Sequence, residues 1–73
     1  MINNLTIIYE MGESGWWIAS IPEIPGAFSQ GKTRDSAKKN VIDAANELML
    51  ARRKAALKGH PKNADVENLR LFA

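Results

Sequence analysis

Cysteine is absent from this chain of 73 residues, and several other features that assign a protein to a class are missing with it. Without cysteine there are no disulfides, no thiolate nucleophiles and no cysteine-based zinc sites, and a reducing compartment is compatible with the composition. No apolar run approaches the about 20 residues that cross a bilayer. The start of the chain lacks the basic and apolar regions of a secretory signal. We therefore expect a soluble cytoplasmic protein.

An excess of charge of one sign is also missing. Ten basic and eight acidic residues leave a formal net charge of +2. A balance this close does not require a nucleic-acid partner, so direct binding of RNA or DNA is not expected. The length predicts a single domain, residues 1–73, near the lower size at which one core suffices, so that self-association or a partner would help its stability.

The segment Ile21–Thr33 contains a pattern with a misleading chemical meaning. Within it, Gly26–Thr33 matches G-x-x-x-x-G-K-T, the loop whose backbone amides and lysine hold nucleotide phosphates. We interpret the match as chance, because such a loop leaves a buried strand directly and here Pro22 and Pro25 interrupt the residues ahead of it. Residues Ala27–Gln30 suit a short third strand instead, after a turn at the second proline.

Two apolar runs before this segment predict a β-hairpin. They are Leu5–Glu10 and Trp16–Ile21, separated by a turn at Gly12–Gly15. With a period of two, Leu5, Ile7 and Tyr9 share one face of the first strand, and Trp17, Ala19 and Ile21 share one face of the second. The opposite faces are apolar as well, with Ile8, Trp16 and Ile18.

A second apolar sheet face has a consequence for association. One helix covers only one side of a small sheet, and a contiguous exposed apolar patch usually marks an interaction surface. We therefore expect either self-association, as a dimer or tetramer, or a protein partner. The alternative is that Trp16 lies along a rim with its indole N–H in water.

A long helix is predicted over Arg34–Lys58. Thr33 is the expected N-cap, accepting from the amide of Asp35 or Ser36, and Gly59 ends the helix. Its apolar positions recur at alternating spacings of four and three, and a few neighbours widen the stripe: Ala37, Val41, Ala44, Leu48, Ala51 and Ala55, with Ile42, Ala45 and Met49. At about 1.5 Å per residue the helix outruns a short sheet.

The end of this helix carries a basic cluster, Arg52, Arg53, Lys54 and Lys58. We interpret it as solvated charge that complements the negative end of the helix dipole, and the alternative is a dock for RNA or for an acidic partner surface. After a linker, Val66–Phe72 is predicted to form a fourth strand, either within the same sheet or swapped onto a neighbouring subunit.

Catalytic candidates are few. The carboxylates that could be paired for metal binding are Glu10, Asp43, Glu47, Asp65 and Glu67. They are explained as solvated strand ends and a helix surface, and His60 is explained as a loop residue between Gly59 and Pro61. No serine has an evident triad. We therefore predict a protein that is not an enzyme, with no cofactor and no metal.

The residues from Gly15 to Gly26, followed by Ser29, Gly31 and Thr33 ahead of an Ala- and Asn-rich helix, resemble the HicB antitoxin family. The resemblance covers most of the chain. It implies an α+β fold of the order β-β-β-α-β, a small and mostly antiparallel sheet with one long helix on one face, similar to a partial ribonuclease H fold. It also implies that the last strand runs parallel beside the first.

In this family the domain neutralises a HicA-type toxin that cleaves messenger RNA. The resemblance therefore implies a non-enzymatic module that binds a HicA-like toxin and blocks it sterically. A rigid loop and large apolar anchors favour such binding, and the predicted partner-binding residues are Trp16, Ile18, Pro22, Glu23, Pro25 and Gly26.

The chain also departs from the family pattern in two places. Members that regulate their own operon carry a further DNA-binding segment, and this sequence ends at Ala73 without room for one. The alternative function is therefore an orphan homo-oligomeric regulator or scaffold of the same fold without a toxin partner. The second departure is local: Ser36 stands where an acidic residue often follows the capping threonine by three places.

Overall fold

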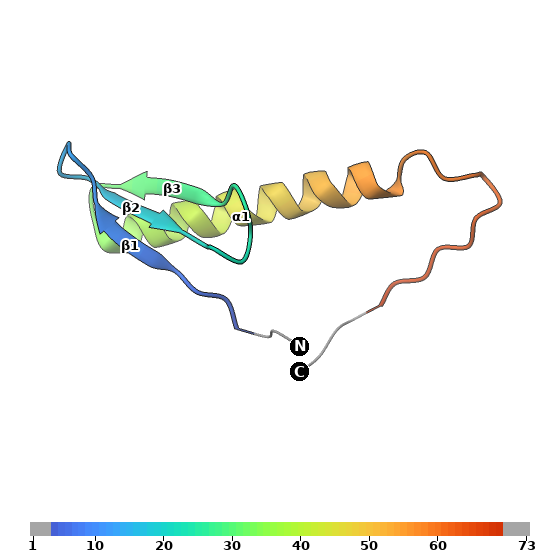
Figure 1. The fold of residues 1–73 in the computed structure, drawn as a ribbon, viewed down its shortest axis with the longest axis horizontal. Helices are drawn as coiled ribbons and strands as arrows, with labels where there is room; N and C mark the ends of the chain where they lie inside the picture. The colour runs from blue at the N-terminus through green and yellow to red at the C-terminus, as the bar shows by residue number, and fades with distance from the viewer. Residues whose placement is uncertain (1–3, 70–73) are drawn as a thin grey trace.

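The computed structural model describes residues 4–69 and contains three strands followed by one helix. The elements are β1 (Ile8–Met11), β2 (Trp17–Ser20), β3 (Phe28–Gly31) and α1 (Arg34–Leu57). The strands form one antiparallel sheet in the order β1-β2-β3, and α1 lies across one of its faces (Figure 1). This is the predicted α+β fold with a small open sheet and one long helix.

The hairpin between β1 and β2 follows from its glycines. The amide of Gly12 donates to the carbonyl of Trp16 at 2.7 Å, and the amide of Gly15 donates to the carbonyl of Gly12 at 3.1 Å. Gly15 has φ of 83°, the left-handed conformation that closes a three-residue hairpin loop. The ladder then pairs Tyr9 with Ala19, which places the predicted set of alternate side chains on the helix side.

The helix begins at the predicted cap. The amide of Ser36 donates to Thr33 Oγ1 at 3.1 Å, and Ser36 Oγ accepts from the amide of Thr33 at the same distance. Serine therefore completes the capping box that an acidic residue usually completes. The helix ends at Leu57, one residue before the predicted end, and Gly59 follows it with φ of 81°.

Small side chains build the core between sheet and helix. The buried residues are Ala19, Ile21, Ala27, Ala37, Val41 and Ala45. A Cβ atom built on Gly31 would lie 2.3 Å from Ser36 Oγ and 2.5 Å from the amide nitrogen of Ala37. The end of β3 and the first turn of α1 therefore meet backbone to backbone, and glycine at this position is required by close approach.

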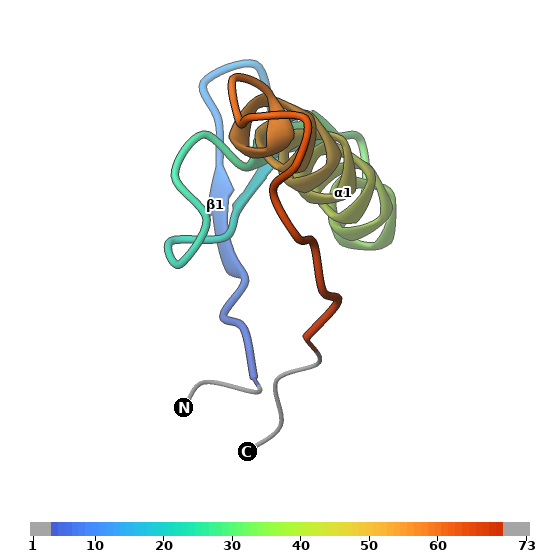
Figure 2. The same cartoon turned by 90° about the vertical axis from the view of Figure 1, so that its right-hand side faces the viewer.

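The second half of α1 extends past the sheet (Figure 1), and Figure 2 shows α1 beside β1 from the end at which the helix overhangs. From Met49 onward every helical residue is exposed. The predicted overhang is confirmed, and Ala51 and Ala55 of the apolar stripe lie on it and are exposed. The periodicity continues beyond the point at which a sheet is available to cover it. Within residues 4–69 no helix has both the length and the apolar character needed to span a membrane.

The tail after the helix differs from the prediction. Over Val66–Leu69 no strand is formed, and Arg70–Phe72 lie outside the described residues. Arg53 Nη2 donates to Asn68 Oδ1 at 3.1 Å, and this hydrogen bond holds the tail beside the end of α1 instead of at the edge of β1. The apolar side chains of Val66 and Leu69 are exposed.

Gly31→Ala should strongly destabilise the fold, by about 2 to 3 kcal/mol, because the new methyl group overlaps the first helical turn. Urea unfolding followed by far-UV circular dichroism measures the loss. Gly15→Ala is the matched control, since it meets no atom within 4 Å and should cost only the about 1 to 2 kcal/mol of left-handed strain. Equal losses in the two variants would contradict the backbone contact.

Candidate functional site

The six predicted partner-binding residues form two separate groups. Trp16 directly precedes β2 and Ile18 lies within it, whereas Pro22, Glu23, Pro25 and Gly26 belong to the connection that follows β2. The structure does not bring these groups into one patch. We call the helix-free side of the sheet the open face, and residues 21–27 the proline loop.

The open face is defined by the strand register. One row across the sheet is Ile8, Ser20 and Phe28, and the next row is Glu10, Ile18 and Gln30. Phe28 is 67% exposed and Ile8 is 43% exposed, so that both belong to the same surface as Ile18. Neither was among the predicted site residues, although the period-two alternation already placed Ile8 on the face opposite to Ile7 and Tyr9.

Trp16 extends the open face toward the hairpin loop. Its ring is 37% exposed, and Lys32 Nζ lies 5.7 Å from the ring centroid. An ammonium over an aromatic ring is attracted by the negative face of the π system. The lysine of the phosphate-loop pattern therefore lies beside a tryptophan, and Phe28–Gly31 of that pattern is a strand paired with β2 and not a phosphate-binding loop.

The proline loop consists of two consecutive turns. The amide of Ile24 donates to the carbonyl of Ile21, and the amide of Ala27 donates to the carbonyl of Ile24, each at 3.0 Å. Pro22 and Pro25 each occupy the second position of a turn, which their fixed φ favours, and the third position of the second turn is a glycine with positive φ. The amide of Ile21 closes the loop by donating to the carbonyl of Ala27 at 2.9 Å.

Two side-chain contacts hold the proline loop from opposite ends of the sequence. The carboxylate of Glu23 accepts from the amide of Thr6 at 2.9 Å and from its hydroxyl at 2.6 Å. From the helix, Arg52 Nη2 donates to the carbonyl of Pro25. Our interpretation of the basic cluster as solvated charge is therefore incomplete, because Arg52 and Arg53 both donate hydrogen bonds within the chain.

An apolar groove borders the proline loop. It runs between the segment before β1 and the exposed flank of α1, and its lining residues are Leu5, Ile21, Ile24, Ile42, Ala45, Asn46 and Met49. Ile24 belongs to both the loop and the groove, so the two features form one continuous surface. Sequence reasoning placed Ile42 and Met49 on the widened helix stripe but did not connect them with the loop.

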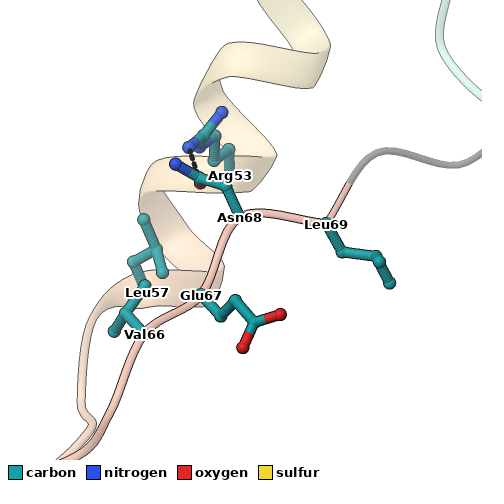
Figure 3. A pocket seen from close by; sticks show the side chains of 6 residues that line it. All are labelled: Arg53, Leu57, Val66, Glu67, Asn68 and Leu69. Atoms are coloured by element: carbon teal, nitrogen blue, oxygen red, sulfur yellow. Dashed lines mark hydrogen bonds between the residues drawn. The ribbon is translucent and has the colours of Figure 1, made fainter.

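A second groove lies between the end of α1 and the tail (Figure 3). Figure 3 shows the bond between Arg53 and Asn68 at one side of it, with Leu57 and Val66 at the other. Nearby, His60 Nε2 lies 2.9 Å from the carbonyl of Ala56, so this histidine caps the helix end. The described residues contain no group of three or more histidines and carboxylates placed to share a metal ion.

Glu23 has an altered acidity. The hydrogen bond from the Thr6 hydroxyl, followed by that from the Thr6 amide, lowers the pKa of the carboxyl below its ordinary value of 4.5. Both bonds favour the ionised form, and they outweigh a small opposing effect of desolvation.

Comparison with known proteins finds a relative for part of the chain. Over 39 residues the chain is 38% identical to UPF0150 protein Ta0767 of Thermoplasma acidophilum, and the aligned part is 53% of this chain and 56% of that protein. The chain thus spans about half the length of the curated relative it matches. No family model matches the chain, and no solved structure matches it.

The Glu23 contact predicts a pH dependence. Since the folded pKa is lowered, the stabilisation is present above the unfolded pKa of about 4.5 and is lost as the pH falls through the lower folded value. Carboxyl NMR titration should give Glu23 a pKa below its ordinary value of 4.5. Thr6→Ala removes the hydroxyl donor and should raise the Glu23 value toward normal, and an unchanged value would contradict the assignment.

Arg52 should keep the proline loop closed. Arg52→Met retains much of the side-chain stem but loses the bond to Pro25, and the amides of Ile24 and Ala27 should then exchange with solvent about tenfold faster. Amide exchange followed by NMR measures this. Arg53→Met, which loses only the bond to the tail, is the control and should leave both amides protected.

Proposed function

We propose that this chain is a non-enzymatic, antitoxin-type module that binds a HicA-like, mRNA-cleaving toxin and blocks it sterically. The observation that carries the proposal is the proline loop, which is closed by its own turns and held by Thr6 and Arg52. A loop ordered before binding loses little entropy when a partner covers it.

The surface around the loop suits a protein partner. Pro22, Glu23, Pro25 and Gly26 are exposed, and Ile24 leads from them into the apolar groove. The combination gives a small apolar depression beside a rigid polar edge, and protein interfaces commonly have an apolar centre with a polar rim. An acidic side chain at the edge also complements a basic nuclease surface.

The family side of the proposal rests on two supports. The motif from Gly15 to Thr33 resembles HicB antitoxins. The chain is also similar over 39 residues to a protein of the UPF0150 family, which is HicB-like. Inhibition by coverage needs no catalytic group in this chain. The partner's active site would be closed by protein surface alone, and RNA would be excluded from it.

The test uses the full chain and a HicA-like toxin encoded next to its gene, in a catalytically inactive form. Size-exclusion chromatography with light scattering should show a hetero-complex, and adding this chain to the active toxin should stop RNA cleavage. The variant Pro22→Ala with Pro25→Ala should weaken the complex about tenfold, since the loop then loses entropy on binding.

Pro61→Ala is the matched control for this experiment, because Pro61 lies in the exposed linker after α1 and away from the proline loop. It should leave the complex unchanged. The proposal fails if no complex forms at micromolar concentrations, or if the two proline variants lower the affinity equally.

A second candidate function is an orphan homo-oligomeric regulator or scaffold without a toxin partner. The open face favours it, because Ile8, Trp16, Ile18 and Phe28 leave an apolar surface exposed on a small domain. A homo-oligomer that ignores the toxin in the same chromatography experiment would support this candidate over the first.

A further inference from the structure

We infer that the open face binds a second copy of this chain, and that the two sheets stack face to face about a two-fold axis running along β2. In this arrangement Ile18 of one copy lies against Ile18 of the other at the centre. The rotation places β1 of one copy over β3 of the other, so that Ile8 of one copy meets Phe28 of the other.

The pattern of side chains on the open face is suited to stacking on itself. Large apolar groups occupy both outer strands, with Ile8 on β1 and Phe28 on β3, and only Ser20 separates them. Two sheets that pack face to face stand about 10 Å apart and interdigitate their side chains. The serine between the two large side chains leaves room for that interdigitation.

The charges select the direction of the axis. Glu10 lies on β1, and Lys32 follows β3 with its ammonium over Trp16, so the acidic and basic groups stand at opposite edges of the open face. Rotation about an axis along β2 places β1 of one copy over β3 of the other. Each Glu10 then approaches Gln30 and Lys32 of the other copy, which gives two equivalent favourable contacts.

The competing face-to-face arrangement has its axis across the strands. That rotation places β1 over β1 and β3 over β3, so the edge with Glu10 faces its own copy and the edge with Lys32 faces its own copy, and Glu10 has no basic group of the other copy opposite it. Like charges placed opposite one another disfavour an interface. The charge pattern thus identifies a second copy in one orientation as the occupant, and the apolar rows alone would not have chosen between the two.

The expected affinity is modest. The open face comprises three strands of four residues each. The area that it can bury is therefore smaller than the about 800 Å² per partner of a standard interface. Interfaces of that class are weak, so association should depend on concentration in the micromolar to millimolar range.

Analytical ultracentrifugation of the full chain over roughly 10 μM to 1 mM tests the inference. Glu10→Lys and Lys32→Glu should each weaken the dimer about tenfold, because the two-fold axis makes every reversal act twice. The double variant should restore the wild-type affinity, since it reverses both partners of each contact. Ile18→Lys places a charge at the centre and should give a monomer.

Control variants distinguish a specific contact between Glu10 and Lys32 of the two copies from a general effect of net charge on dimerisation. Glu47→Lys and Lys39→Glu make the same charge changes on exposed helix positions and should leave the dimer unchanged. Circular dichroism verifies that each variant is folded. A monomer at all concentrations, a double variant that stays weak, or helix variants that weaken the dimer equally would each overturn the inference.

This dimer is independent of toxin binding. The combined Pro22→Ala and Pro25→Ala variant, which tests the proline loop, should leave dimerisation unchanged, because the loop lies beyond the other end of β2 from Trp16. A loss of the dimer in that variant would show that the open face is not the contact surface.

Discussion

The contact between Gly31 and the first turn of α1 sets the geometry of the whole domain. Because β3 meets the helix backbone to backbone, the residues that follow along the interface must be small, and the buried helix positions are Ala37, Val41 and Ala45. A core of this size covers one face of the sheet and no more. The open face remains because one helix covers only one side of the sheet, and α1 overhangs because its 24 residues outrun strands of four residues each.

The proline loop gains its rigidity from three separate parts of the chain. Its own turns fix the backbone, Thr6 holds Glu23 from the N-terminal side, and Arg52 holds Pro25 from the helix. The overhang of α1 is therefore useful, since it carries Arg52 to a position at which the loop can be held. A buried hydrogen-bond network is not needed, because two turns with proline at the second position are already restricted in conformation.

The two proposed interactions use different surfaces. The proline loop and its groove present an apolar depression with a polar edge, which suits a different protein. The open face has an acidic group at one edge and a basic group at the other, a pattern that complements a second copy turned about β2. Both surfaces can be occupied together because they lie at different ends and sides of the sheet. A small domain can in this way gain stability by association while it keeps a separate surface for a partner.

The sequence by itself determined the hairpin, the helix with its Thr33 cap, and the alternation that puts Ile8 and Ile18 on the faces opposite to Tyr9 and Ala19, because glycines, caps and periodicity act over a few residues. Only the tertiary structure decided which partners distant residues found. It separated Trp16 from the proline loop, gave Arg52 a carbonyl acceptor, left Ala51 and Ala55 exposed, and held the tail beside the helix over Val66–Leu69. These outcomes depend on where a short sheet ends beneath a long helix, and no local pattern encodes that distance.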